Sequence, residues 1–361
     1  MRKNHGILNI ILALIFGVHM TPVSARAVDS SELPSGGTIV GGSGEIISGS
    51  GEMRVNQYSS NMTVNWDTFN IGTDARVQFV QPGTSSVAVN NIFDASPSQI
   101  LGSLCANGQV FLLNSAGIIF GWSAQVDVGG LVASSLRLSQ TDFDAGHFVF
   151  ENSVQAGDVL NHGNITGGYV ALLSHHVINE GNINSDSSAV ALIAADKVSL
   201  DFSGDSLINY TVDKGAVDAQ VKNSGLIAVD GGLVVVTARA RDELTNAVVN
   251  NTGVIEATSL VEAGGRIILD AGENGQSTVT GVVDASSEKA QGGRIVVTGD
   301  RVLIEENARL LARGATGGGE IYVGGGWQGA DPAIGQAVGT VVSKGALLDA
   351  SATDAGNGGT V

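Results

Sequence analysis

The feature that most restricts the fold of this 361-residue chain is a short unit that recurs along its second half. Each unit is a glycine pair ahead of a short run of mostly apolar or β-branched residues. The pairs begin at Gly231, Gly264, Gly292 and Gly318, so successive units lie 33, 28 and 26 residues apart. Spacings of this size are typical of a repeat array in which each unit forms one coil.

A second unit alternates with the first and places an asparagine two residues before a glycine and a short apolar run. It occurs at 161–165, 179–183, 223–227 and 251–255. We expect glycine to supply positive φ at the corners and stacked asparagine side chains to form hydrogen-bonded ladders. Strands of three to five residues between such corners predict an all-β chain wound as a parallel β-helix.

The composition supports a solenoid. The chain is 43% hydrophobic but only 5% aromatic and 15% charged, with 51 glycines. Such a composition suits thin, regular layers of small β-branched side chains better than the core of a globular enzyme.

The net charge argues against a nucleic-acid partner. It is −17 for the whole chain, and residues 1–27 contribute three positive charges and no acid, which leaves −20 for the remainder. A phosphate backbone would be repelled by such a surface. No stretch has the regular acidic spacing of a calcium loop, so we expect no metal or cofactor.

Cys105 is the only cysteine, so no disulfide can form within the chain. We predict that it is a buried small hydrophobic residue. Without crosslinks, nothing covalent would prevent the chain from passing through a pore in extended form.

Residues 1–27 have the pattern of a secretory signal peptide. Arg2 and Lys3 precede an apolar run at 7–18, and Ala25-Arg26-Ala27 offers a cleavage site before Val28. The run is too short to anchor the chain in a bilayer. We therefore expect export to the periplasm, and divide the mature chain into a domain at 28–150 and continuing repeats at 151–361, a truncated part of a longer protein.

Three stretches of the mature chain have distinct expected roles. Residues 28–52 are rich in glycine and serine around two or three short strands, and we expect them to cap the solenoid. Residues 102–135 pack three short apolar runs between tight turns, and we expect successive windings there. Residues 139–157 are less regular, and we expect an excursion from the coils.

An ordered series of motifs resembles the filamentous haemagglutinin family, in particular the N-terminal two-partner secretion (TPS) domain of large exported adhesins. The resemblance is closest over residues 35–150. The motifs are Asn65-Trp66-x-x-Phe69-x-Ile71-Gly72, Gln81-Pro82, and the segments 86–90, 97–100, 106–112 and 125–134.

The resemblance implies a right-handed parallel β-helix that directs secretion. It implies as partner a cognate outer-membrane β-barrel transporter with periplasmic partner-binding domains, through which the chain passes unfolded to the cell surface or extracellular space. Main-chain pairing of an extended segment with the partner would suit such recognition. A receptor on a host cell or another bacterium would be a further partner.

One motif departs from the family pattern of Asn-Pro-Asn-Gly followed by Ile, Val or Leu. The matching residues here are Asn114-Ser115-Ala116-Gly117-Ile118. Proline fixes φ at the first central position of a turn, and asparagine is favoured at the second. We therefore expect a looser turn with the same fold.

The resemblance also yields candidate residues for recognition by the transporter. For the first three, packing of the cap is an equally good interpretation. The candidates are Asn65, Trp66, Phe69, Asn114, Gly117, Ile118, Phe120 and Gly121.

Two groups of residues have the side chains of metal ligands, but we expect neither to form a metal site. His175 and His176 are adjacent and would point to opposite faces of a strand. Asp142, Asp144 and His147 lie close in sequence but have no visible supporting residues.

Two other functions are compatible with a β-helix. Polysaccharide-active enzymes need carboxylates or basic groups clustered on one outer face beside a groove. Here the acidic residues are scattered and the basic residues sparse, so we expect no enzyme. The stem of a contact-dependent toxin would need a C-terminal toxin domain, which residues 1–361 do not show.

Overall fold

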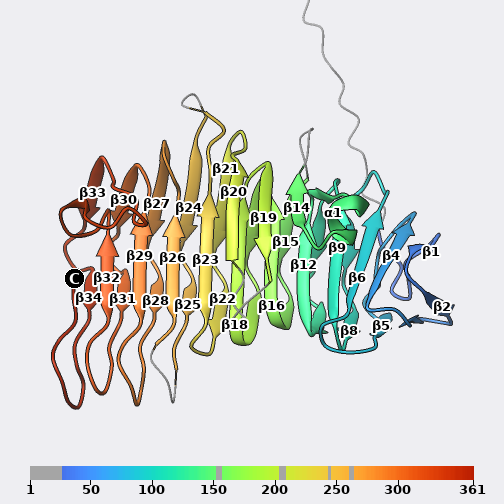
Figure 1. The fold of residues 1–361 in the computed structure, drawn as a ribbon, viewed down its shortest axis with the longest axis horizontal. Helices are drawn as coiled ribbons and strands as arrows, with labels where there is room; N and C mark the ends of the chain where they lie inside the picture. The colour runs from blue at the N-terminus through green and yellow to red at the C-terminus, as the bar shows by residue number, and fades with distance from the viewer. Residues whose placement is uncertain (1–26, 152–156, 203–208, 243–244, 260–263) are drawn as a thin grey trace, which may run out of the picture.

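Short apolar runs separated by glycine and asparagine form strands that wind into a parallel β-helix (Figure 1). This computed structural model describes residues 27–361 except 152–156, 203–208, 243–244 and 260–263. The predicted signal peptide at 1–27 thus lies almost entirely outside the described residues. Within them, no helix is long and apolar enough to cross a membrane.

Successive coils place one strand on each of three faces. The first face holds β3 (Glu52–Gln57), β5 (Arg76–Val80), β8 (Ser103–Ala106), β11 (Gln125–Val128), β22 (Leu226–Val229), β25 (Val254–Glu256), β28 (Val282–Asp284), β31 (Arg309–Leu311) and β34 (Leu347–Asp349). The second holds β4 (Asn61–Trp66), β6 (Val87–Ile92), β9 (Gln109–Asn114), β12 (Gly130–Ser134), β23 (Leu233–Ala238), β26 (Arg266–Asp270), β29 (Arg294–Thr298) and β32 (Glu320–Val323). Two long strands continue from the first face to the second, β16 (Asn164–Ser174) and β18 (Asn182–Ala194). The third holds β7 (Ser98–Ile100), β10 (Ile118–Phe120), β15 (Val159–Asn161), β17 (His176–Asn179), β21 (Ala219–Asn223), β24 (Ala247–Asn251), β27 (Gly275–Val279), β30 (Arg301–Ile304) and β33 (Gly339–Val342).

The register of the second face confirms that each glycine-pair unit is one coil. Arg266 lies opposite Leu233 on one side and Arg294 on the other, and Arg294 lies opposite Glu320. These partners follow the spacings of the repeat in the sequence. Residues about 30 positions apart in sequence are therefore neighbours across the sheet.

The asparagine ladder predicted from the second unit is also confirmed. Asn161 Nδ2 donates to Asn179 Oδ1 at 2.8 Å, Asn179 donates to Asn223 at 2.7 Å, and Asn223 donates to Asn251 at 2.8 Å. All four side chains are buried. The ladder satisfies polar groups that would be costly to bury alone.

The prediction that glycine supplies positive φ at the repeating corners is wrong for the asparagine units. Gly225 does not have a positive φ; a Cβ there would lie 2.0 Å from the carbonyl oxygen of Gly181, and one at Gly253 would lie 2.2 Å from that of Gly225. Glycine is needed at these positions because adjacent coils approach so closely that no side chain fits. Among the glycine pairs, Gly231 has a positive φ of 64°, but Gly264, Gly292 and Gly318 do not, so the prediction is wrong for these three units too.

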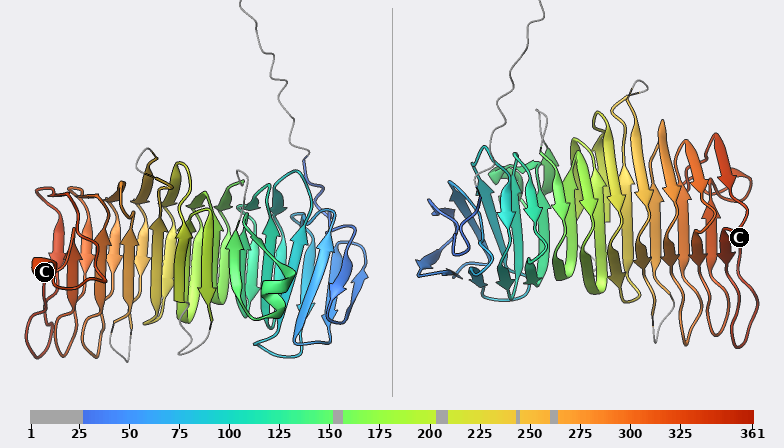
Figure 2. Two further views of the ribbon diagram at one scale, coloured as in Figure 1. Left: turned by 45° about the horizontal axis from the view of Figure 1, so that its top comes forward. Right: turned by 180° about the vertical axis from the view of Figure 1, so that it is seen from behind.

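The cap predicted at residues 28–52 is present at the N-terminal end of the solenoid. Two strands, β1 (Thr38–Gly41) and β2 (Gly44–Ser48), pair antiparallel with β4 and β3 and form the cap. Figure 2 shows this cap at one end of the solenoid and the C-terminus at the other. The predicted all-β, capped β-helix is thus confirmed.

The predicted excursion is confirmed as an outer layer. It contains the short helix α1 (Gln140–Asp144) and an antiparallel sheet of β13 (Arg137–Leu138), β14 (Phe148–Glu151), β19 (Lys197–Asp201) and β20 (Asn209–Lys214). This sheet covers a second apolar cluster outside the helix, built around Phe111 and Phe150. Farther along the chain, a 3-10 turn η1 (Trp327–Gly329) begins a loop over the second face.

Candidate functional site

The two predicted recognition motifs meet at one corner of the first coils. In the stacked strands β4, β6 and β9, Trp66 lies opposite Ile92, and Ile92 lies opposite Asn114. The motifs are therefore about 50 residues apart in sequence but only two coils apart in space. The structure brings them together because the sheets are parallel and in register.

The first motif is packed into the cap. Trp66 and Phe69 are fully buried and meet edge to face, with ring centroids 5.3 Å apart. The indole Nε1 of Trp66 donates to Asn90 Oδ1 at 2.9 Å. Asn65 is half-buried and accepts a hydrogen bond from Asn91. The aromatic pair thus fills the interior of the first coils.

The second motif forms a turn whose asparagine is fully buried. Asn114 Nδ2 donates to the Ser96 carbonyl and to Ser98 Oγ, at 3.1 and 3.0 Å. Its Oδ1 accepts from the Ala116 amide at 2.9 Å. Asn114 therefore joins its own turn to the preceding coil.

The conformation of this turn follows from the positions of positive φ. The Gly117 amide donates to the Asn114 carbonyl at 2.9 Å, which closes a four-residue β-turn. Neither Ser115 nor Ala116 has positive φ, which excludes type II and the primed turns and leaves type I. Gly117 has φ 112°, and a Cβ there would lie 2.6 Å from the Asp158 carbonyl oxygen. The looser turn expected from the loss of proline remains a prediction.

The last three candidate residues, Ile118, Phe120 and Gly121, are also buried. Strand β10, which carries the first two, is paired on both sides by β7 and β15. Seven of the eight candidates are thus buried, and Asn65 is half-buried. In the folded protein the seven buried residues are not available to a partner.

Asp142 and Asp144, which the sequence offers as possible metal ligands, are hydrogen-bonded within and next to α1. Ser139 caps α1 by accepting from the Asp142 amide and donates to the Asp142 carboxylate, while Asp144 accepts from Gln140. The described residues contain no group of three or more possible ligands placed to hold a metal ion. The prediction for Cys105 is wrong: it is half-buried, because Leu104 takes the inward-facing position of β8 and Cys105 faces outward.

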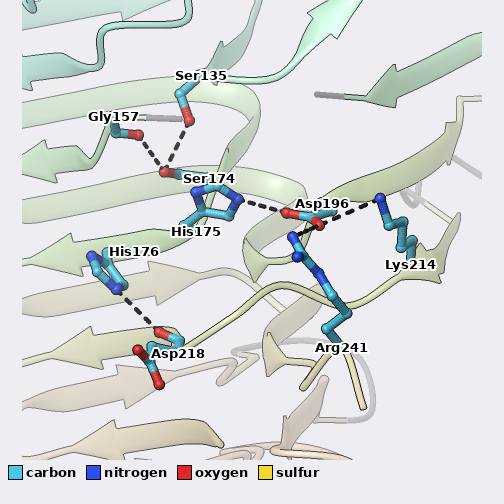
Figure 3. Close-up of polar contacts among 9 residues, drawn as sticks. All are labelled: Ser135, Gly157, Ser174, His175, His176, Asp196, Lys214, Asp218 and Arg241. Carbon is cyan, nitrogen blue, oxygen red and sulfur yellow. Dashed lines mark hydrogen bonds and ion pairs between the residues drawn. The ribbon is translucent and has the colours of Figure 1, made fainter. Parts of the chain in front are cut away.

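A buried carboxylate that the sequence did not single out links the outer sheet to the coils (Figure 3). Asp196 is 3% exposed and lies 2.6 Å from His175 Nε2, 2.5 Å from Arg241 Nη2 and 3.6 Å from Lys214 Nζ. His176 faces Asp158 and the Asp218 carbonyl instead. The two histidines thus have separate partners.

Charged residues that are scattered or sparse along the sequence gather at one place in the structure. On the second face, a hollow of about 210 Å³ is lined by Arg239, Arg266, Arg294 and Asp270, among others. The parallel coils gather residues that are about 30 positions apart in sequence. A sequence signal was present, because Arg266 and Arg294 each directly follow a glycine pair and thus occupy the same place in the repeat.

An ion pair organises this hollow. Arg239 Nη2 lies 2.6 Å from Asp270 Oδ2. Burial opposes ionisation of Asp270, but the hydrogen bond and the charge of Arg239 outweigh it and lower the pKa of the carboxyl below its ordinary value. Burial raises the pKa of Tyr210, which lines the same hollow.

The comparison with protein families gives one match over most of the chain. A family model described as the TPS secretion domain matches residues 31–285. The solved HMW1 secretion domain from Haemophilus influenzae is 31% identical with a TM-score of 0.80, over 88% of this chain and 84% of that one. A filamentous hemagglutinin secretion domain has a TM-score of 0.48 at 15% identity, over 87% of this chain and 98% of that one.

Among curated proteins, a Heme/hemopexin-binding protein of Haemophilus influenzae is similar to this chain. It is 29% identical over 274 residues, which cover 73% of this chain and 30% of the relative. A second protein of the same name and species is 29% identical over 244 residues, 61% of this chain and 26% of its own length. The matched part of this chain therefore spans less than a third of the length of these two curated relatives.

Proposed function

The chain belongs to the family of TPS secretion domains, and we propose from this premise that its first coils are recognised by the transporter before they fold. As a secretion domain of a two-partner secretion exoprotein, it has a cognate outer-membrane transporter as partner. Proteins of this kind are secreted to the cell surface or extracellular space. The open questions are which residues the transporter reads, and when.

Burial of the candidate residues supports recognition before folding. Trp66, Phe69 and Asn114 have essentially no exposed surface in the folded chain. Their side chains are accessible to a partner only while the chain is extended. The same residues then close the first coils, so recognition and folding use one set of side chains in succession.

The proposed route begins with the signal peptide at 1–27, which would deliver the chain to the periplasm. There the unfolded segment containing both motifs would add to periplasmic partner-binding domains of the transporter by main-chain pairing. The single cysteine leaves the chain without an internal crosslink that would obstruct passage. Folding on the far side buries the motifs and disfavours return.

A binding experiment tests the order of recognition and folding. The periplasmic region of the cognate transporter is titrated with a peptide of residues 60–125 and with the whole chain in its folded form. We expect the peptide to bind and the folded chain to bind at least about tenfold more weakly, a difference of 1.4 kcal/mol. Equal affinity for the folded chain would contradict the proposal.

A matched pair of variants separates recognition from stability. Asn114 and Asn223 are both buried asparagines with several hydrogen bonds, but only Asn114 lies in the motif. Asn114→Ala should weaken binding when introduced into the 60–125 peptide and reduce secretion of the whole chain. Asn223→Ala should destabilise the purified protein without the same loss of secretion. Equal secretion losses at equal destabilisation would indicate that Asn114 serves the fold alone.

A further inference from the structure

A groove that the secretion function does not use lies on the second face, beyond the outer sheet. It consists of the 210 Å³ hollow described above and an adjoining hollow of about 640 Å³, and the two share the Arg239–Asp270 pair as a wall. Strands β26 and β29 form the floor of the smaller hollow. Tyr210 of β20 lines it from the outer sheet, and Asp331 and Ile334 line it from the loop after η1.

The charges divide between the two hollows. The smaller one has three arginines against the carboxylates of Asp270 and Asp331, and thus a net positive lining. The larger one has two arginines against four carboxylates, and thus a net negative lining. Glu320, outside the lining, also pairs with Arg294, so Arg266 is the arginine of the smaller hollow whose charge no carboxylate of the described residues pairs with.

The arginines of the smaller hollow are not equally neutralised. Arg239 is paired with Asp270, and Arg294 lies 3.3 Å from both Glu320 and Asp331 and stacks on the ring of Tyr322 at 4.9 Å. Arg266 stands in register beside Arg294, is exposed, and has no ion-pair partner among the described residues. Like charges on adjacent strands are unfavourable, and Glu320 and Asp331 pair with Arg294 but not with Arg266.

The hydrogen-bonding capacity of the groove is also unfilled. Nη1 of Arg239 is buried without a hydrogen-bond partner in the described part of the protein, and Nε of Arg294 has only the Glu320 carboxylate, 3.3 Å away. Buried donors are normally satisfied by protein, water or ligand. Together with the exposed guanidinium of Arg266, they leave this face with donors in excess over acceptors.

We propose that this groove binds an acidic oligosaccharide, with a carboxylate or sulfate on Arg266 in the smaller hollow and neighbouring hydroxyls in the larger one. A guanidinium binds such an anion in a bidentate manner. The carboxylates of the larger hollow, Glu273 and Asp300 among them, are acceptors for sugar hydroxyls. The smaller hollow has room for about one sugar ring, and Tyr210 offers it an aromatic surface.

The floor of the groove favours a saccharide over an acidic peptide. Extended peptides commonly bind by adding a strand to a free sheet edge. Strand β26 is paired with β23 and β29, and β29 is paired with β26 and β32. No main-chain edge is therefore free on this floor, and a ligand must be recognised by side chains.

Titration calorimetry on the folded chain tests the proposal. The probes are a heparin-derived hexasaccharide, an oligogalacturonate, neutral maltohexaose and poly-glutamate. We expect one or both acidic saccharides to bind, maltohexaose to bind at least about tenfold more weakly, and Arg266→Gln to weaken acidic binding about tenfold. The matched control is Arg309→Gln, the same charge change at an exposed residue of β31 on the first face.

Several results would overturn the proposal. Absence of binding by both acidic saccharides would remove the site. Tighter binding of poly-glutamate than of either saccharide would point to an acidic peptide. Equal losses from Arg266→Gln and Arg309→Gln would reduce the effect to overall charge. Because the assay uses the folded chain without the transporter, its outcome is independent of the proposed export recognition.

Discussion

The buried asparagine ladder allows a sharp test of how polar groups are accommodated inside this β-helix. Asn223 accepts from Asn179 at 2.7 Å and donates to Asn251 at 2.8 Å. Replacing it with valine leaves the Asn251 carbonyl without its donor and the Asn179 amide with only a long hydrogen bond to the Leu226 carbonyl, at 3.4 Å. Valine should fit, because Val279 follows Asn251 in the same column.

The expected cost follows from the number of polar groups left unpaired. Each buried group without a partner costs about 1–3 kcal/mol, so Asn223→Val should cost about 2–6 kcal/mol. Asn251→Val leaves the Asn223 amide with only long hydrogen bonds to the Gly225 and Val254 carbonyls, at 3.4 Å, and should cost about 1–3 kcal/mol. In the double variant only the Asn179 amide loses its side-chain acceptor without replacement, so this variant should be more stable than Asn223→Val alone.

Urea unfolding followed by circular dichroism measures these stabilities, compared at equal m value. Hydrogen exchange in β21 and β24 shows whether the loss is local to the ladder. The decisive quantity is the interaction free energy in the double-mutant cycle. If the costs of Asn223→Val and Asn251→Val simply add in the double variant, unpaired amides do not determine the stability of the asparagine ladder, and the prediction is wrong.

Four further predictions concern other sites. Asp196→Asn removes a buried carboxylate from His175 and from the half-exposed Arg241 and Lys214. It should lower the free energy of unfolding by about 2–4 kcal/mol and speed hydrogen exchange in β19 and β20. Unchanged exchange would contradict the linking role of Asp196. The pKa of Asp270 is lowered in the folded state, so the stability that this carboxylate contributes is present above the ordinary carboxyl pKa of about 4 and is lost as the pH falls below it. Asp270→Asn should therefore flatten the acid limb of a profile of stability against pH. An unchanged acid limb would contradict this role of Asp270. Burial, and then the charge of Asp284, raises the pKa of Glu256, so its ionisation opposes folding at neutral pH; Glu256→Gln should raise the urea midpoint at pH 7 and have no such effect at pH 3. Ser115→Pro suits the type I turn and should raise stability by about 0.4–1 kcal/mol in thermal unfolding, whereas a loss would mean that the turn cannot accept the fixed φ.

The candidate site shows where sequence reasoning reached its limit. Family motifs identified the segments around Trp66 and Asn114, but no local pattern indicated that both would be buried at one corner. Burial depends on which coil stacks on which. The cluster around Asp196 depends on the same stacking, because its partners come from positions 175, 214 and 241.

The sequence by itself determined the coil. Alternating glycine and asparagine units set the length of each turn, the short strands and the asparagine ladder, since these depend on the conformation and spacing of nearby residues. The tertiary structure alone explains most of the repeating glycines, which are needed because adjacent coils approach closely. It also decides which charged residues line the groove. Arg239, Arg266 and Arg294 appear isolated along the chain, but parallel stacking lines one hollow with all three. Contacts between coils are long-range, so they follow from the register of the whole solenoid.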